Sequence, residues 1–316
     1  MSEPVAGRQS ALVTGGAGFI GSHLVRRLLL DGYRVRVLDN FATGNPENLD
    51  GLEDLEVVEG DIRSRQDVGA AMAGIDHVFH VAALPSVARS WKDPVATLAT
   101  NAHGTANVVE AAVDAQVSCL VYSSSSSVYG EQDAELKKED LDPRPISPYA
   151  YSKLLGEKIA LAHARQHNGL RIVALRYFNV FGARQDPDSP YSAVIPLFIK
   201  QALAGGAGTI HGDGMQSRDF THVDNVVEAN IRAAQSEANG IAMNIACGQS
   251  HTLLDLVEAI ADLNGRPFLT AFGPPREGDI RHSRADISLA TAQIGYRPKV
   301  SFQAGLKRTF EDYRSA

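Results

Sequence analysis

The segment best suited to chemistry is a predicted helix start that carries a tyrosine and a lysine. Tyr149 and Lys153 stand at positions i and i+4, so a helix places both side chains on one face. Ser147 fits the N-cap and Pro148 the first helical position. An ammonium beside a phenol favours the phenolate and lowers the phenol pKa from its reference value of about 10. We therefore predict that Tyr149 is a general base near neutral pH, whereas Tyr151, on another face, packs or faces solvent.

A run of serines, residues 123–127, follows the apolar segment 117–122. We expect segment 117–122 to be a strand, with the serines at its carboxyl end, where open α/β sheets bind ligands. Serines are unsuited to a core strand or a tight turn, but their hydroxyls are suited to an alcohol or a ketone. A flexible polar loop is the alternative for most of them. We predict that one hydroxyl hydrogen-bonds the reacting oxygen of a substrate.

A glycine-rich turn near the N-terminus has the spacing of a dinucleotide-binding site. Gly15, Gly18 and Gly21 follow the apolar segment 10–14 and open a predicted helix over residues 21–31. Gly15 permits a tight turn, Gly18 lets a pyrophosphate approach the backbone, and Gly21 allows close helix packing. The helix N-terminus adds N–H donors and a partial positive charge. The tyrosine–lysine pair alone also fits an ordinary amphipathic helix. Together with the glycine turn, the pair favours a catalytic site.

Two acidic residues follow the next two predicted strands. Asp39 ends the second strand, about 20 residues beyond the glycines, as expected for a carboxylate that binds the adenosine ribose. Its charge would repel a 2′-phosphate, so we predict NAD rather than NADP. Asp61 follows the third strand and is placed to meet the adenine. A plain strand–helix turn with Asp39 as a cap is the alternative.

The elements that must position these residues form an alternating pattern of strands and helices. Such a pattern, with strands that read as continuous apolar runs, predicts a Rossmann-type α/β fold, a doubly wound parallel sheet. After Asn179 glycine and proline become denser, which indicates a smaller C-terminal α/β substrate lobe. We place an NAD-binding domain at 1–178 and the lobe at 179–316, with about 224–250 returning to the first domain. The predicted strands are 10–14, 34–38, 55–59, 77–81, 117–122 and 171–176, and a further helix covers 224–235.

Composition excludes several classes of function. The net charge of −7 disfavours nucleic-acid binding, which needs basic surface. Apolar runs stay below the roughly 20 residues of a spanning helix, and residues 1–10 do not resemble a signal peptide, so we expect a cytoplasmic protein without a membrane partner. The two cysteines, Cys119 and Cys247, cannot build a disulfide framework or a four-ligand zinc site. The histidines lack metal-ligand spacing, so we predict no metal.

The motifs together resemble the extended short-chain dehydrogenase/reductase family, and within it the nucleotide-sugar 4-epimerases. The resemblance extends from Ala11 to about Tyr313. It rests on Thr14–Gly21, Leu38–Phe41, Gly60–Ile62, His80–Ala83, Ser123–Gly130, Tyr149 with Lys153, Arg176–Gly182 and Arg218–Asp219.

The resemblance implies NAD-dependent 4-epimerisation of a UDP-hexose. Tyr149 would remove the proton of the 4-hydroxyl while hydride passes from C4 to NAD, and Ser125 would hydrogen-bond the sugar oxygen. Lys153 would also contact the nicotinamide ribose. The 4-keto sugar would then rotate and receive the hydride on its opposite face, so the cofactor stays bound through turnover.

The resemblance also implies two sets of binding residues. Asn179 is similar to the family's diphosphate-contacting asparagine, and Arg218 and Arg276 to its pair of diphosphate arginines. Without the flanking motifs, both arginines would fit a solvated surface. The predicted cofactor residues are Gly15, Gly18, Phe19, Ile20, Gly21, Asp39, Asn40, Asp61, Ile62, Ala82, Ala83, Asn101, Tyr149, Lys153 and Tyr177. The predicted substrate residues are Ser86, Arg89, Ser125, Ser126, Asn179, Val194, Arg218, Arg276, Asp279 and Ser283, of which Asp279 would bind the uridine ribose.

The choice of sugar rests on the small residue Ser283. A tyrosine at this place restricts similar enzymes to glucose and galactose, whereas a small residue admits a 2-N-acetyl group. We therefore expect UDP-GlcNAc and UDP-GalNAc as substrates, with possible activity on UDP-Glc and UDP-Gal, as in the UDP-N-acetylglucosamine 4-epimerases of bacterial polysaccharide pathways. UDP-glucuronate 4-epimerases are the close alternative, but they have a threonine where this chain has Asn179.

Three other interpretations remain. Similar dehydratases and decarboxylases have acidic residues where this chain has Ser126 and Ser127, so these two activities are disfavoured. An oxidoreductase that releases NADH shares the first half-reaction. A noncatalytic NAD-binding sensor is disfavoured because the serine, tyrosine and lysine are all present.

The resemblance further implies a homodimer built on helices 94–115 and 148–166, whose apolar faces could equally be buried within one chain.

Overall fold

The structure, a computed structural model, describes the whole chain except residues 1–7, 133, 135, 190, 276–279 and 316. The chain separates into two compact units. Within the described residues, unit 1 comprises Met1–Ser124, Ser147–Leu175 and Ala229–Ala242. Unit 2 comprises Ser125–Ile146, Arg176–Glu228 and Met243–Ala316. The chain therefore crosses between the units several times, and residues 125–146 of unit 2 precede the boundary predicted at residue 178.

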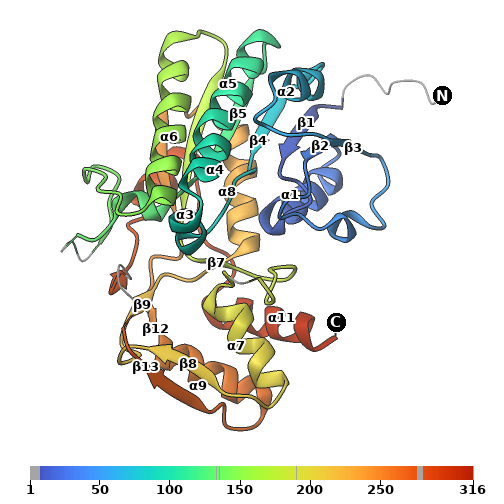
Figure 1. The fold of residues 1–316 in the computed structure, drawn as a ribbon. Coiled ribbons are helices and arrows are strands. Elements are labelled where there is room, and N and C mark those ends of the chain that lie inside the picture. Colours follow the sequence, from blue (N-terminus) through green and yellow to red (C-terminus); the bar gives the residue numbers. More distant parts are fainter. Residues whose placement is uncertain (1–7, 133, 135, 190, 276–279, 316) are drawn as a thin grey trace. The chain divides into compact units, whose positions relative to one another are not determined.

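The largest described sheet has seven strands, in the order β11-β6-β5-β4-β1-β2-β3. Figure 1 labels the strands β1 to β5 of this sheet. The pairs β1–β2, β2–β3, β1–β4 and β4–β5 are parallel. Because β1 lies between β2 and β4, the strand order reverses there, as in a doubly wound fold. The predicted fold class is confirmed. The strands are β1 Ser10–Thr14, β2 Arg34–Asp39, β3 Leu55–Glu59, β4 His77–His80, β5 Cys119–Ser125, β6 Arg171–Tyr177 and β11 Ile241–Ile245.

Helices of unit 1 cover this sheet because their apolar faces must be buried. Helices α2, α5 and α6 pack side by side over a core that contains Leu12, Val78, Val108, Leu120 and Ile172. Helix α1 packs against β1 and β2. The helices that precede residue 167 are α1 Phe19–Leu30, η1 Pro46–Leu49, α2 Arg65–Met72, α3 Val87–Lys92, α4 Pro94–Leu98, η2 Ala99–His103, α5 Gly104–Asp114, η3 Ser126–Tyr129 and α6 Pro148–Gln166.

Unit 2 has a separate aromatic core. Phe181, Phe198, Phe220, Phe302 and Phe310 are all buried in it, between short strands and helices α7, α9 and α11. The remaining elements are β7 Val180–Phe181, α7 Val194–Leu203, β8 Gly208–His211, β9 Ser217–Arg218, β10 Thr221–His222, α8 Val223–Gln235, β12 His251–Thr252, α9 Leu253–Asn264, β13 Thr270–Gly273, β14 His282–Ser283, α10 Ser288–Ile294 and α11 Phe302–Ser315.

Two predicted elements differ from the structure by more than one or two residues at an end. The strand predicted over 117–122 is β5, which runs on to Ser125, so the prediction that the serines are unsuited to a core strand is wrong. Ser123 and Ser124 are buried in it, and Ser124 has a buried hydrogen-bond partner. The helix predicted over 94–115 is interrupted by the single π-helical turn Ala99–His103, so it consists of α4, η2 and α5.

Among the described residues, every helix is too short or too polar to cross a lipid bilayer. Both cysteines are free thiols.

Candidate active site

The glycine turn joins β1 to α1 and is closely packed. Gly15 has φ +71°, and a Cβ built on it would lie 2.7 Å from the Ala82 Cα. A Cβ on Gly21 would lie 2.1 Å from the Gly15 carbonyl oxygen. Gly18 is the N-cap of α1, and it has no side chain to occupy the N–H donors of the first turn, where Phe19 and Ile20 stand. The turn thus leaves backbone donors at a helix N-terminus, which fits a dinucleotide pyrophosphate.

Asp39, at the end of β2, is 7% exposed and holds this turn. Its Oδ2 accepts the Ala17 N–H at 2.9 Å, and its Oδ1 accepts the Phe41 N–H at 2.9 Å. Each carboxylate oxygen can accept a further hydrogen bond. The capping interpretation and the ribose interpretation are therefore compatible, since Asp39 can hold the turn and still accept from ribose hydroxyls.

Asp61 and Asn40 form a small polar cluster after β3 and β2. Asn40 Nδ2 donates to Asp61 Oδ2 at 2.9 Å, and Arg63 Nη2 donates to the same oxygen at 2.7 Å. The hydrogen bonds from Arg63 lower the pKa of Asp61 to about 2, so this carboxylate is ionised at neutral pH. Ile62 is buried, and its side chain packs where Gly104 leaves room for it.

A buried chain of hydrogen bonds connects β1, β4 and α5. Thr105 Oγ1 donates to the Asn101 carbonyl at 2.7 Å, so it accepts from His80 Nε2 at 2.9 Å. His80 Nδ1 then accepts from Thr14 Oγ1 at 2.7 Å, and Thr14 Oγ1 accepts the Ala82 N–H at 3.3 Å. Burial lowers the pKa of His80 to about 3, so its ring is neutral. The chain fixes the backbone at Ala82, a predicted cofactor residue.

Asn101 positions the segment after β4. Its Oδ1 accepts the Leu84 N–H at 2.7 Å, and its Nδ2 donates to the Leu84 carbonyl and to Ser152 Oγ, both at 3.0 Å. Ala82 and Ala83 immediately precede Leu84 and are partly exposed. The side chain of Asn101 thus ties this loop to helix α6.

Helix α6 begins as the sequence predicts. Ser147 Oγ accepts the Ala150 N–H at 3.2 Å, and Pro148 is the first helical residue. Tyr149 and Lys153 follow one turn apart, with Tyr149 partly exposed and Lys153 only 3% exposed. Tyr151 is 58% exposed, on a different face.

Lys153 is surrounded by β5 and its own helix. Its Nζ lies 4.7 Å from the centroid of the Tyr122 ring, and Tyr122 Oη donates to the Lys153 carbonyl at 3.2 Å. Burial lowers the pKa of Lys153 to about 7, and the negative charge of Glu157 opposes this shift. The amine is therefore poised to change its charge close to neutral pH.

Ser125 ends β5 and caps the single turn Ser126–Tyr129. Its Oγ accepts the Ser127 N–H at 3.2 Å and the Ser127 hydroxyl at 2.9 Å. With both lone pairs used in this way, its own O–H proton can be donated to a ligand. Ser125 and Ser126 belong to unit 2, whereas Tyr149 and Lys153 belong to unit 1.

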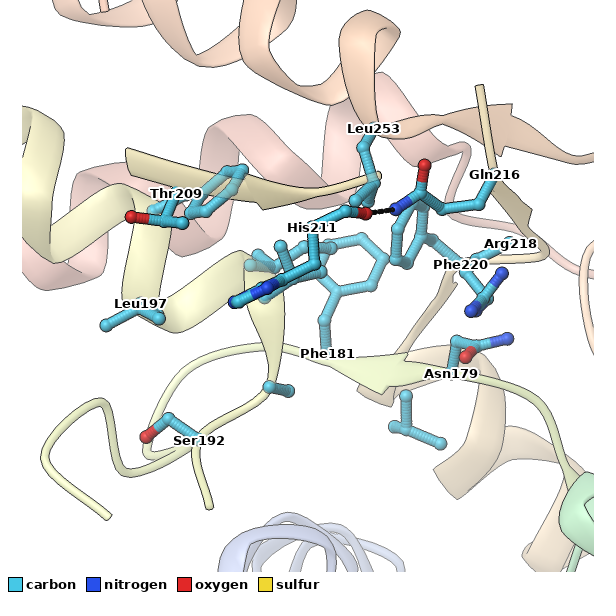
Figure 2. A pocket seen from close by; sticks show the side chains of 15 residues that line it. Asn179, Phe181, Ser192, Leu197, Thr209, His211, Gln216, Arg218, Phe220 and Leu253 are labelled. Atoms are coloured by element: carbon cyan, nitrogen blue, oxygen red, sulfur yellow. Dashed lines mark hydrogen bonds between the residues drawn. The ribbon is translucent and has the colours of Figure 1, made fainter. Parts of the chain in front are cut away.

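A cavity of about 260 Å³ lies within unit 2 (Figure 2). Three predicted substrate residues line it, namely Asn179, Val194 and Arg218. Arg218 Nη1 donates to the Ser217 carbonyl at 2.9 Å. The structure thus brings together residues that are far apart in the sequence. Asn179 and Arg218 supply amide and guanidinium donors at one side of a cavity whose lining is both apolar and polar.

Several residues that line the cavity were not predicted from the sequence. His211 and Thr209 alternate along β8 and both line the cavity, and the amide of Gln216 donates to the His211 carbonyl at 2.6 Å (Figure 2). The Oε1 of Gln216 is buried and accepts no hydrogen bond from the described residues. The alternation of residues 209 and 211 before the Gly212 turn was the signal that could have found them.

Asp219 joins three segments of unit 2. It is fully buried, and its carboxylate accepts the N–H groups of Cys247 at 2.9 Å, Gly248 at 3.0 Å and Ala285 at 3.2 Å. Burial raises its pKa to about 6 despite these bonds. Asp219 follows Arg218 directly, so this anchor fixes the strand that carries the arginine.

The other described residues that were predicted to bind substrate do not line this cavity. Ser283 is 8% exposed in β14, where it pairs with Arg218 of β9. Ser86 has φ +88° and caps α3 by accepting the Arg89 N–H at 3.3 Å. Tyr177, a predicted cofactor residue, ends β6 and is 7% exposed. Two further predictions, Arg276 and Asp279, lie outside the described residues.

A family model and the sequences of known proteins both match most of this chain. The model of the family "NAD dependent epimerase/dehydratase family" matches residues 11–246. A UDP-glucose 4-epimerase of Mycolicibacterium smegmatis is 39% identical over 314 residues, which cover 96% of this chain and 98% of that protein.

Two solved structures are similar along their whole length. A UDP-N-acetylglucosamine 4-epimerase from Methanobrevibacter ruminantium, in complex with UDP-N-acetylmuramic acid, is 39% identical with a TM-score of 0.93, covering 98% of this chain and 99% of that chain. A Thermus thermophilus UDP-glucose 4-epimerase, in complex with NAD, is 37% identical with a TM-score of 0.89, covering 98% of this chain and 100% of that chain. The predicted cofactor, NAD, is confirmed.

Proposed function

The chain belongs to the NAD dependent epimerase/dehydratase family, and on this basis we propose that it interconverts the C4 epimers of a UDP-hexose. The observation that carries the proposal is the pair on α6. Lys153 is 3% exposed and stands one helical turn from Tyr149, so its charge acts in a medium that screens it weakly. The closely packed glycine turn at the end of β1 fits the cofactor that such chemistry requires.

The chain's own residues would handle the proton. Tyr149 removes the proton of the sugar 4-hydroxyl, because the Lys153 ammonium stabilises its phenolate. Ser125 donates its O–H to the same sugar oxygen, since its Oγ already accepts from Ser127. NAD, when bound, supplies the site to which the C4 hydride goes and from which it returns. After rotation of the keto sugar, Tyr149 gives the proton back.

The cavity of unit 2 suits the nucleotide end of the substrate. Arg218 and Asn179 offer cationic and amide donors of the kind that bind a diphosphate. The imidazole of His211 offers a flat face to a nucleobase. These features support a UDP-linked substrate.

For the sugar, we propose UDP-GlcNAc and UDP-GalNAc, with UDP-Glc and UDP-Gal as further substrates. Ser283 supports this choice, because a small side chain at its place leaves room for an N-acetyl group. UDP-glucuronate is the alternative sugar, and Asn179 is the residue that disfavours it. A release of NADH and a keto sugar is the alternative reaction.

A panel of UDP-sugars tests the proposal. Purified protein is incubated with each sugar, and the epimers are separated by chromatography while absorbance at 340 nm is followed. We expect a C4 epimer to form without net growth of the NADH signal. Turnover of UDP-glucuronate alone would reject the choice of sugar, and steady accumulation of NADH would reject epimerisation.

The general base is tested by Tyr149→Phe, with Tyr151→Phe as its matched control. Both changes remove one phenolic hydroxyl from α6, but Tyr151 is 58% exposed and lies away from Lys153. We expect Tyr149→Phe to lower kcat by about 10²-fold or more, and Tyr151→Phe to keep it. A Tyr149→Phe protein as active as wild type would favour a noncatalytic NAD-binding protein.

We also propose a homodimer. Val108, Val109 and Ala112 are fully buried within unit 1, so they cannot form an interface. Six large apolar side chains of unit 1 stay exposed on α3, on α6 and on α4, which packs against α6. A second copy of the chain would cover this surface, and sedimentation measures the outcome. These exposed side chains are Val87, Trp91, Val95, Leu98, Tyr151 and Leu155.

A further inference from the structure

Helix α6 carries a buried glutamate that takes no part in the proposed proton transfer. Glu157 is 1% exposed, although a glutamate is rarely fully buried unless it is paired. It stands one turn beyond Lys153, at the i+4 position, so the two side chains share a helix face. The spacing places Tyr149, Lys153 and Glu157 in one row along the helix.

Strand β5 closes the other side of this row. Ser124 Oγ donates to Glu157 Oε2 at 2.7 Å, which orients the carboxylate. Tyr122, two residues earlier on the same face of the strand, donates its hydroxyl to the Lys153 carbonyl and lies with its ring 4.7 Å from Lys153 Nζ. Lysine and glutamate are thus enclosed by the same strand and helix.

We propose that Glu157 is a positioning residue of the catalytic site, which keeps the buried Lys153 protonated so that its ammonium can stabilise the Tyr149 phenolate. This proposal rests on the proposed function only for the role of the ammonium. The claim that Glu157 keeps Lys153 protonated rests on the burial of both side chains, their spacing on α6 and their contacts with β5, and it does not depend on the proposed function.

Electrostatics supports the proposal. Burial disfavours the ammonium and lowers the pKa of Lys153 to about 7, while the charge of Glu157 raises it. Near neutral pH a substantial fraction of Lys153 is therefore charged. Without the carboxylate, burial would act unopposed, and most of the amine would be neutral and unable to stabilise a phenolate.

Other titratable groups near Lys153 do not replace Glu157. On β5, Tyr122 is neutral because burial raises its pKa well above the usual value. On β4, burial keeps His80 neutral. The elements packed against α6 carry further titratable groups, namely Arg89 and Lys92 of α3, His103 of η2, and Glu110 and Asp114 of α5. His103 and Asp114 are exposed, and Glu110 pairs with Arg65.

The test measures the titration of Lys153 itself. The protein is labelled with lysine that carries ¹³C at the ε carbon, and the NMR shift of each lysine is followed from pH 5 to pH 11. The Lys153 signal is identified by its loss in Lys153→Met. In Glu157→Gln we expect the midpoint of Lys153 to move down by about one pH unit or more. Glu157→Asp, which keeps the charge, should restore much of the difference.

Glu110→Gln is the matched control, because it also turns a carboxylate into an amide, on a helix that packs against α6. We expect it to leave the Lys153 midpoint unchanged. A Lys153 midpoint in Glu157→Gln equal to that of wild type would overturn the proposal. If Glu157→Gln fails to fold, the same comparison between Glu157→Asp and wild type decides, since a shortened carboxylate should shift the midpoint measurably.

The pH profile of kcat connects this titration to catalysis. Because the charged amine is the active form, activity falls as pH rises through the pKa of Lys153. In Glu157→Gln this fall should occur about one pH unit lower, so that kcat is within about twofold of wild type at pH 6 and about tenfold lower at pH 8. A shifted Lys153 midpoint with unchanged catalysis would reject the proposed role of the ammonium, but it would support the proposal that Glu157 keeps Lys153 protonated.

Discussion

Ser283 and Arg218 are neighbours across two parallel strands, β14 and β9, where their Cα atoms are register partners. Neighbouring strands lie about 4.8 Å apart, so the two positions are held at a fixed short spacing. Arg218 lines the cavity of unit 2. Ser283, its neighbour across the two strands, is 8% exposed. The residue proposed to limit sugar size and a residue proposed to bind diphosphate are therefore parts of one small sheet.

Enlarging Ser283 tests this arrangement. We expect Ser283→Tyr to abolish turnover of UDP-GlcNAc and UDP-GalNAc while UDP-Glc and UDP-Gal remain substrates, because the phenol fills the space for the acetyl group. Ser283→Ala, which stays small, should keep both pairs. Equal kcat/KM of Ser283→Tyr and wild type on UDP-GlcNAc would show that Ser283 does not limit the sugar pocket.

Arg218 and His211 are expected to bind different parts of the nucleotide. Replacing Arg218 by Gln should weaken binding of UDP by about tenfold or more, the size of a lost charged hydrogen bond, and leave uridine binding unchanged. Replacing His211 by Ala should weaken both ligands alike, since both contain the base. Titration calorimetry measures the four affinities, and equal losses for UDP and uridine in Arg218→Gln would contradict the diphosphate assignment.

The sequence predicted the elements well where local signals and burial agree. β1 and β3 have their predicted bounds, and α6 begins at Pro148 because a serine cap and a proline act together at one place. Ser123 and Ser124 were misplaced because a hydroxyl can be buried when a tertiary partner accepts from it. That partner, Glu157, lies 33 residues from Ser124 and on another element, so the local pattern could not reveal it.

For a similar reason, the sequence predicted some parts of the candidate site and not others. The glycines and the tyrosine–lysine pair depend on local spacing, which a sequence displays. The cavity depends on side chains such as Asn179 and His211 that come together only when unit 2 folds. The hydrogen-bond chain through His80 and Thr105 likewise joins separate strands and helices, although His80 belonged to a motif of the resemblance.

The neutral His80 predicts acid sensitivity. Its folded pKa of about 3 lies below the usual 6.5, so the unfolded chain binds the proton more readily. Stability from this residue is fully present above pH 6.5 and is lost as pH falls from 6.5 towards 3. Between pH 7 and pH 5 we expect a loss of about 2 kcal/mol from this residue.

Urea unfolding of wild type and His80→Gln at several pH values measures the effect. Asp219, whose pKa is raised to about 6, has the opposite sign, because its stability contribution is lost as pH rises through 6. The difference between the two proteins removes the Asp219 contribution, which they share. A difference in unfolding free energy that stays constant from pH 7 to pH 5 would contradict a buried neutral His80.

The proposed dimer predicts that a charged residue on the exposed face of α6 disrupts the contact between the two copies. Leu155 is 48% exposed, so Leu155→Asp should fold normally in one chain but place a charge in an apolar interface. We expect sedimentation to show a monomer for Leu155→Asp and a dimer for Leu254→Asp, a matched change at a 37% exposed leucine of unit 2. A wild-type protein that sediments as a monomer would reject the homodimer.

Lys153 and Glu157 should also depend on each other for stability. Removing either charge leaves the other buried without its opposite, which is strongly destabilising, whereas removing both can be nearly neutral. We therefore expect Lys153→Met and Glu157→Gln each to lower the free energy of unfolding, and the double variant to lower it by less than the sum, with a coupling of about 1 to 3 kcal/mol at pH 6. At pH 6 the lysine is largely charged, since its pKa is about 7. At pH 9 the amine is neutral, so the coupling should shrink; additive losses at both pH values would mean that the two side chains do not interact.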